Sequence, residues 1–176
     1  RESPCACMDT VMASDDQVIF APFTFTQGIG VFDPDSEVFS VVAVNNYQLP
    51  VYAFWGAVSA GDGQVVFAPC DSTGIGVYEA HTSAFSLVDI SVARLGATHG
   101  LDGTKKFSGA ALATNGQVIF APFSQDHVGV FNPATRVFTL VSTSILGGIL
   151  AQHMFSAAVA MSHGEVFFTR LSNTQA

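Results

Sequence analysis

A chain of 176 residues is long enough to bury a substantial core, and 49% of its residues are hydrophobic while only 11% are charged. Its 14 acidic and 6 basic residues give a net charge of −8, which repels phosphate backbones, so no nucleic-acid partner is expected. The mean hydropathy of +0.41 is high for a water-soluble domain and indicates that part of the surface is covered by something else.

The chain repeats one short string along its length. Gln17 and Gln117 each begin the string Gln-Val-Ile-Phe-Ala-Pro-Phe, Gln64 begins a near copy, and Glu165 begins a shorter one. The copies recur at intervals of roughly 50 residues, which is the period of a repeat architecture. One apolar run precedes each of the first three copies and two follow it, so each full unit holds four such runs.

These runs are expected to be β-strands, because they are short, rich in Val, Ile and Phe, and separated by turn residues. Asp62-Gly63 and Asn115-Gly116 lie between the first and second runs, where such dipeptides are typical of tight hairpins. Asp33-Pro34 and Asn132-Pro133 lie between the third and fourth runs, where the leading Asp or Asn can cap the turn. No helical periodicity of useful length occurs.

A four-stranded antiparallel meander repeated at this period predicts an all-β chain that forms a β-propeller segment of about three and a half blades. The whole chain, 1–176, is expected to be one propeller domain or part of one. In chain order, the expected blades are 7–44, 54–91 and 107–143, followed by a half blade at 155–171, and the connections are 45–53, 92–106 and 144–154.

The stretch 118–138 resembles the YVTN-type β-propeller repeat in its order of strand, small polar turn, strand and Asn-headed turn. The likeness extends over most of residues 7–171, and it departs from that pattern where Ala-Pro-Phe stands in place of a Thr-Asn ending. Kelch-type blades are a weaker match, because their paired glycines and spaced Tyr and Trp are missing. The resemblance implies a propeller fold and says little about function, since propellers support many activities.

Three and a half blades do not close a ring, because propellers typically have at least about four. The second strand of the half blade would present an open hydrogen-bonding edge. We expect further sequence to supply the missing strands, with a partner chain as the second alternative and a pairing of two copies as the third.

The loops between the second and third strands and the connections between blades are expected to share one face, the usual ligand face of a propeller. A divalent metal held there by His99, His127 and His153 with Asp71 or Asp126 is one interpretation. Because the histidines fall at different places in their repeats, solvated loop residues are the preferred interpretation. Asp126-His127 as a general-base pair lacks a recognisable nucleophile, so no catalytic residue, metal or cofactor is predicted. The polar residues of this face are Asp71, His99, Asp102, Asp126, His127 and His153.

Lys105 and Lys106 form the only basic pair and are expected to be solvated. Trp55 takes the place that Ser108 and Ser156 hold in the other inner strands, and it is expected to pack against a neighbouring blade rather than project into the central channel. At least one cysteine must be unpaired within the chain, and small buried side chains or one long-range disulfide both fit the set of Cys5, Cys7 and Cys70.

Two connections are apolar, although connections usually run over the surface. They are expected to form an interaction patch on the loop face, with a loop tucked over its own blades as the equal alternative. The residues of this patch are Leu49, Tyr52, Ile145, Leu146, Ile149 and Leu150.

These observations predict a non-enzymatic propeller that acts as a protein-interaction platform or accessory subunit of a larger assembly. A propeller hydrolase or lyase with its site on the loop face is the alternative, and a carbohydrate-binding propeller is the second, with 1 Trp and 3 Tyr for stacking on sugars. No apolar run reaches the about 18 residues of a membrane span, so the chain is expected not to span a membrane, while docking on a membrane-associated complex is compatible with it. A processed organellar-lumen or secreted protein is favoured over a cytoplasmic one.

Overall fold

The computed structural model describes residues 7–24, 27–91, 103–143 and 155–170, and these form an all-β fold. Three four-stranded antiparallel sheets and one two-stranded sheet follow one another, and the strand order within each sheet follows the sequence. Each sheet is one blade of a propeller. Blade one consists of β1 (Cys7–Met12), β2 (Val18–Pro22), β3 (Gly28–Asp33) and β4 (Val38–Ala43), and blade two of β5 (Phe54–Gly61), β6 (Gln64–Pro69), β7 (Gly74–Glu79) and β8 (Ala84–Asp89). Blade three consists of β9 (Phe107–Leu112), β10 (Val118–Pro122), β11 (His127–Asn132) and β12 (Val137–Ser142), and the half blade of β13 (Phe155–Ala160) and β14 (Val166–Arg170). Two short 3-10 helices are η1 (Asn45–Tyr47) and η2 (Ala80–Thr82).

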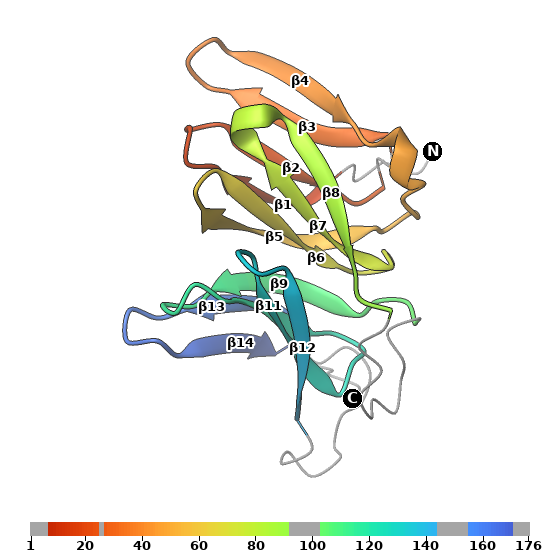
Figure 1. Ribbon diagram of the computed structural model, residues 1–176, viewed down its shortest axis with the longest axis vertical. Coiled ribbons are helices and arrows are strands. Elements are labelled where there is room, and N and C mark those ends of the chain that lie inside the picture. The colour runs from red at the N-terminus through yellow and green to blue at the C-terminus, as the bar shows by residue number, and fades with distance from the viewer. Residues whose placement is uncertain (1–6, 25–26, 92–102, 144–154, 171–176) are drawn as a thin grey trace, which may run out of the picture.

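The blades stack so that the first strand of each lies beside the first strand of the next, from β1 through β5 and β9 to β13 (Figure 1). The approach is closest at two glycines. A Cβ atom on Gly56 would lie 2.8 Å from the Cα of Gly109, and one on Gly109 would lie 2.8 Å from the Cα of Ala157. Glycine at these positions therefore lets the inner strands pack backbone against backbone.

Each interface between full blades joins two kinds of surface. We call the side of a sheet with the Phe residues of its second and fourth strands, and in blades two and three also of its first strand, the aromatic face. We call the side with Val and Ile of its second and third strands the aliphatic face. Alternation of side chains along a strand places these residues on opposite sides. An aromatic face packs on the aliphatic face of the preceding blade, through Ile19, Ile29, Val31, Phe54 and Phe67 in the first interface and Val66, Ile75, Val77, Phe107 and Phe120 in the second.

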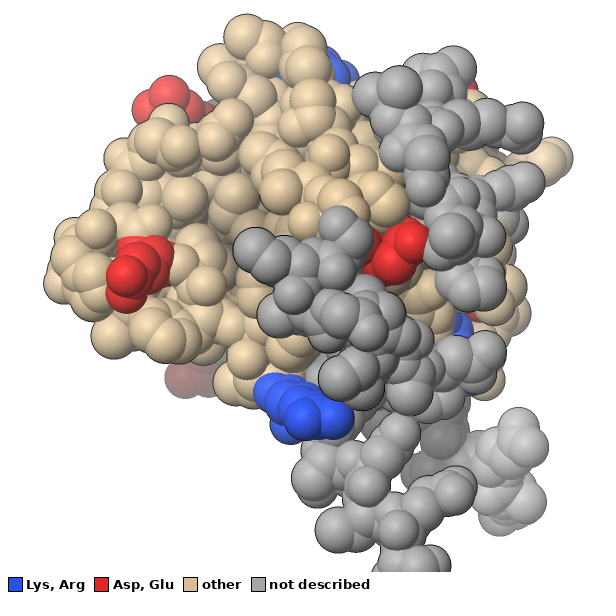
Figure 2. Space-filling model, turned by 90° about the horizontal axis from the view of Figure 1, so that it is seen from below, with Lys and Arg blue, Asp and Glu red and all other residues tan. Residues whose placement is uncertain are grey.

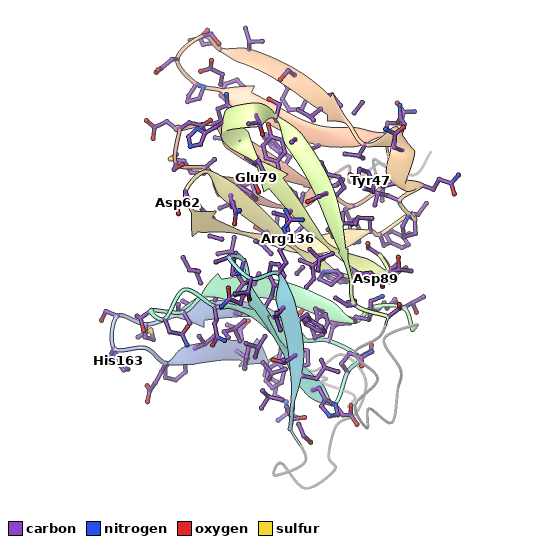
Figure 3. All side chains as sticks on the ribbon, viewed as in Figure 1. Tyr47, Asp62, Glu79, Asp89, Arg136 and His163 are labelled. Carbon is purple, nitrogen blue, oxygen red and sulfur yellow. The ribbon has the colours of Figure 1, made fainter. Side chains whose placement is uncertain are left out.

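Polar contacts also join neighbouring blades. The Tyr47 hydroxyl of η1 donates to the carbonyl oxygen of Phe85 in β8 at 2.7 Å, and the two rings meet edge to face with 5.0 Å between centroids. Arg136 in blade three lies 3.8 Å from Glu79 in blade two (Figure 3). This ion pair is partly exposed and contributes about 0–1 kcal/mol, so apolar packing provides most of the stability of the interfaces.

The first hairpin turn differs between blades. Blade two has the predicted two-residue turn, since Asp62 and Gly63 both have positive φ, at 49° and 76°. In blade three Gly116 has a φ of 80°, while Asn115 keeps a negative φ, and the Gly116 N–H donates to the carbonyl of Ala113 at 2.9 Å. The turn at Asn115-Gly116 is therefore wider than the dipeptide predicts, because only the glycine takes the left-handed conformation.

The turn between β3 and β4 is capped by Asp33, as the sequence predicts. Its Oδ1 accepts the N–H of Asp35 at 2.9 Å, and its Oδ2 accepts the Ser36 hydroxyl at 2.7 Å. Asn132 caps the equivalent turn of blade three by accepting the N–H of Thr135 at 3.0 Å. The hydrogen bonds from the Ser36 hydroxyl and from the backbone lower the pKa of Asp33 below its ordinary value of 3.8.

We predict that Ser36→Ala raises the pKa of Asp33 toward 3.8, because it removes the first cause of the shift. A pKa that is lower in the folded than in the unfolded chain means that ionised Asp33 stabilises the fold above pH 3.8 and that this contribution disappears as acid protonates the folded carboxylate. NMR titration of the Asp33 carboxyl carbon measures the shift, and an unchanged pKa in the variant would contradict the role given to Ser36.

Candidate functional site

Four aromatic side chains form a continuous run across the first three blades, at the end where the connections reach the inner strands. The Phe23 ring centroid lies 4.7 Å from that of Tyr52 and 5.6 Å from that of Trp55. The Trp55 and Phe123 centroids are 4.9 Å apart. We call these four residues the axial aromatic run. Trp55 thus packs against both neighbouring blades, as predicted.

A β-bulge at the start of β5 aims Trp55 into this run. The register of β5 on β6 shifts between Phe54 and Gly56, so Trp55 is the extra residue. The same shift in blade three leaves Ser108 as the extra residue of β9, and its hydroxyl donates to the carbonyl of Phe155 at 2.6 Å. Because bulges re-aim side chains and are frequent beside functional sites, this end of the inner strands is a candidate binding surface.

Backbone hydrogen bonds hold the axial aromatic run in place. They pass from blade to blade at the same end of the sheets, so the rings sit on a fixed frame rather than on free loops. The bonds, each from an N–H to a carbonyl oxygen, are Tyr52 to Phe23 at 2.6 Å, Asp71 to Tyr52 at 3.0 Å, Lys106 to Cys70 at 3.0 Å and Phe123 to Lys106 at 2.9 Å.

Asp71 and its neighbours bind one another. Asp71 Oδ1 accepts the N–H of Lys105 at 2.7 Å and lies 3.6 Å from Cys70 Sγ. Lys106 is buried, and its Nζ donates to the carbonyl oxygen of Gly103 at 2.9 Å. The prediction that Lys106 is solvated is therefore wrong. The hydrogen bond from its backbone N–H to the carbonyl of Cys70 places Lys106 where its side chain is buried. The carbonyl oxygen of Gly103 offsets part of the free-energy cost of burying the ammonium group.

Cys70 is a buried free thiol, and burial together with the neighbouring Asp71 raises its pKa to about 12. The thiol therefore stays protonated at neutral pH and is a poor nucleophile. We predict that in a chain carrying Cys5→Ser and Cys7→Ser, alkylation of folded Cys70 at pH 8 is slower than in urea by roughly two orders of magnitude or more. Equal rates in the two conditions, followed by mass spectrometry, would contradict this assignment.

Asp126 and His127 form a close pair at the start of β11. Asp126 Oδ1 lies 2.5 Å from Nδ1 of His127, which is buried. The carbonyl of Asp126 accepts both the hydroxyl of Thr143, at 2.7 Å, and its N–H, at 3.0 Å, which fixes the loop against the end of β12. A carboxylate that orients a histidine ring is an arrangement compatible with acid–base chemistry.

The predicted polar residues of the loop face do not converge on a metal site within the part of the chain that the structure describes. In that part, no three His, Cys, Asp or Glu side chains are close enough together to hold a metal ion. Asp71 instead binds Lys105, and Asp126 binds His127. The remaining predicted polar residues, His99, Asp102 and His153, lie outside the described residues, as do Cys5 and the side chain of Cys7.

Of the six residues of the predicted apolar patch, the structure describes only Leu49 and Tyr52. Leu49 is 7% exposed and belongs to the core of the first interface, because the connection folds back over blades one and two. Its side chain therefore stabilises the fold and is not available to a partner. Tyr52 is exposed and belongs to the axial aromatic run. The other four residues of the patch, Ile145, Leu146, Ile149 and Leu150, lie outside the described residues.

Another apolar surface lies on blade one, whose aromatic face is not covered by another blade in the described part of the chain. Phe39 of β4 is 57% exposed. Its counterparts Phe85 and Phe138 are partly buried, because each packs against the blade before it. Met12 and Val41 lie on the same side of blade one and are also exposed. A contiguous exposed apolar sheet face of this kind is typical of an interaction site.

Charged side chains are sparse on the side of the molecule shown in Figure 2, where isolated basic and acidic residues are separated by uncharged surface. The described residues of that side form no basic stripe of the kind that follows a phosphate backbone. Among the residues described, no helix has the length and apolar character that crossing a bilayer requires.

The axial aromatic run was not predicted from the sequence as a unit. The available signal was an aromatic residue directly after Ala-Pro in two blades, at Phe23 and Phe123, combined with a tryptophan at the start of an inner strand, Trp55. The bulge that brings them together is a property of strand register, which composition does not reveal.

No protein-family profile and no curated protein matches the sequence. Among solved structures, the chain is similar to virginiamycin B lyase from Staphylococcus aureus, with 13% identity and a TM-score of 0.72 over 97% of this chain and 51% of that one. It is similar to a streptogramin B lyase, with 15% identity and a TM-score of 0.66 over 99% and 54%. An extracellular domain of a hybrid two-component system from B. thetaiotaomicron gives 15% identity and a TM-score of 0.59 over 93% and 19%. The chain spans about half the length of the two lyases, and the shared feature is the β-propeller fold.

Proposed function

We propose that this chain is a non-enzymatic propeller segment that serves as a protein-interaction platform within a larger assembly. The observation that supports this function is the uncovered aromatic face of blade one, which carries Met12, Phe39 and Val41. The same kind of face is covered by a neighbouring blade in both interfaces between full blades, so it has the composition of an interface rather than of a solvated surface. The occupant is a protein partner or further blades that complete the propeller.

The finer features of the proposal follow from the repeat. We assign the unit to the YVTN-type repeat, on the strength of its strand and turn order in 118–138. A secreted or organellar-lumen location is compatible with extracellular domains being among the similar folds. The connection 45–53, in which Val51 and Tyr52 are exposed, is proposed together with 144–154 as a second contact surface.

The test uses two adjacent residues of β4 that lie on opposite sides of the sheet. Phe39 is 57% exposed on the aromatic face, and Val38 is 55% exposed on the other. We expect the purified chain to bind a hydrophobic dye and to associate in sedimentation velocity, and we expect Phe39→Ser to weaken both effects while the matched control Val38→Ser leaves them in place. A wild-type chain that sediments as a monomer and binds no dye would remove the support for this function.

A propeller hydrolase or lyase is the second candidate, and the Asp126–His127 pair favours it, because the carboxylate orients a buried imidazole. Two of the proteins with similar structures are named as lyases. Metal analysis of the purified chain, with His99, His127 and His153 replaced one at a time, discriminates between the candidates. Stoichiometric metal that is lost in these variants would favour the enzyme, and metal-free protein would favour the platform.

A further inference from the structure

The half blade contains two of the three rings that form the aromatic face of a full blade. Phe155 and Phe168 have their ring centroids 5.4 Å apart with 46° between the ring planes. The corresponding pair in blade two, Phe54 and Phe67, is separated by 5.5 Å with an angle of 36°. In blades two and three a third ring from the fourth strand joins the pair, as Phe85 does at 6.2 Å from Phe54. The two rings of the half blade are therefore arranged so that a third aromatic ring, which its own two strands do not provide, can pack against them.

In every full blade, the third strand puts a glycine opposite the second ring. The pairs are Phe20 with Gly30, Phe67 with Gly76 and Phe120 with Gly129. The glycine is required by space: a Cβ on Gly129 would lie 3.0 Å from a ring carbon of Phe120 and 3.0 Å from one of Phe138. Any larger residue would push the rings apart, so the aromatic set selects glycine at this position of the third strand.

A second position of the third strand is also constant in character. On the aromatic face, the first residue of the second strand is a valine, and the third strand places an aromatic ring opposite this valine. These pairs are Val18 with Phe32, Val65 with Tyr78 and Val118 with Phe131. In the half blade the valine is Val166, so the missing strand is expected to carry glycine opposite Phe168 and an aromatic residue opposite Val166.

Blade three shows where the missing strands would lie. Val141 on the aliphatic side of β12 is 54% exposed. The corresponding Val88 of β8 in blade two is partly buried against blade three. The outer strand of blade three therefore lacks the cover that a completed half blade would give it, and the uncovered area continues an interface that β9 and β13 already make.

We propose that the free edge of β14 accepts a β-hairpin whose first strand places glycine opposite Phe168 and an aromatic residue opposite Val166, and whose second strand adds the third ring. This inference rests on the proposed function, since it names the chemistry of one partner of the segment. A second copy of the chain does not fit this role. In the described residues, the hairpins with the required glycine, β3–β4, β7–β8 and β11–β12, already pair with β2, β6 and β10.

The first experiment extends the full chain after Ala176 by a copy of residues 127–142, which is the β11–β12 hairpin of blade three. The matched control carries Gly129→Val in the appended copy only. We expect the glycine extension to raise Tm by roughly 5–10 °C, since it pairs β14 and covers Val141. We expect the valine extension to raise it little, because its side chain meets the Phe155–Phe168 pair.

The second experiment uses the unmodified chain, with synthetic peptides of residues 127–142 carrying glycine or valine at position 129, and measures hydrogen exchange of Val166–Arg170. A glycine-dependent gain of protection there, or a glycine-dependent rise in Tm in the first experiment, supports the proposal. Equal effects of both versions, or no effect of either in both experiments, overturns it. Slow exchange of β14 in the free chain together with dimeric sedimentation also overturns it in favour of a second copy. The dye and sedimentation experiments test the surface of blade one, at the opposite end of the row of blades from β14. The proposed interaction platform and the proposed hairpin site can therefore fail independently of each other.

Discussion

Phe67→Ala is expected to lower the free energy of unfolding by about 3–5 kcal/mol, the largest effect that we predict for a single side chain. Phe67 is fully buried in the first interface and packs against the rings of Phe54 and Phe85, whose centroids lie 5.5 Å and 6.4 Å away. Truncation removes buried apolar area and leaves a cavity that two neighbouring sheets cannot both move to fill. Urea denaturation followed by circular dichroism measures the loss.

The matched control is Phe167→Ala. Phe167 lies in the second strand of the half blade, as Phe67 does in blade two, but it is 54% exposed. Its replacement is expected to change stability by no more than about 1 kcal/mol, because much of the ring is already in contact with solvent. Comparable losses in the two variants would show that Phe67 is not enclosed between two blades.

Gly109→Val is expected to cost at least about 3 kcal/mol, because its side chain would be driven into backbone. The first added carbon would lie 2.8 Å from the Cα of Ala157 and 2.9 Å from the N of Ala158. Backbone atoms of a paired strand cannot swing aside as a side chain can, so β9 and β13 would have to separate. The unfolding midpoint in urea gives the size of the effect.

Gly116→Ala is the control that separates crowding from backbone conformation. Gly116 has a φ of 80° with no atom within 4 Å of its potential Cβ, so alanine there meets only conformational strain of about 1–2 kcal/mol. Gly109 presents the opposite case, with crowding and no positive φ. If Gly109→Val destabilised the chain no more than Gly116→Ala, the inner strands would not be in close contact.

The strands and their grouping into sheets are predictable because they depend on local pattern. The repeated Gln-Val-Ile-Phe string forms the second strand of each blade, and the capped turns at Asp33 and Asn132 lie where the sequence places them. Alternation of Phe with Val or Ile along these strands then determines the aromatic and aliphatic faces. Local sequence patterns predict these strands because equivalent strands have equivalent neighbours in every blade of the repeat.

The candidate site was less predictable, because it depends on contacts between segments far apart in sequence. Trp55 reaches Phe23 and Phe123 through a shift in strand register, and Lys106 is buried because its backbone binds Cys70. Leu49 reads as a surface residue of a connection, yet it fills the first interface. In each case the position of a whole sheet decides the environment of one side chain, and no local pattern records that position.

The blades stack through their first strands around a common axis, and this arrangement can be tested directly. The most direct measurement is an NMR experiment on the intact chain that detects contacts between Hα protons of Gly56 and Gly109, and of Gly109 and Ala157. We predict both contacts, since a Cβ on either glycine would lie 2.8 Å from the Cα of the next residue in this series. Spectra that show the strand pairings within each sheet but neither of these contacts would contradict the propeller arrangement.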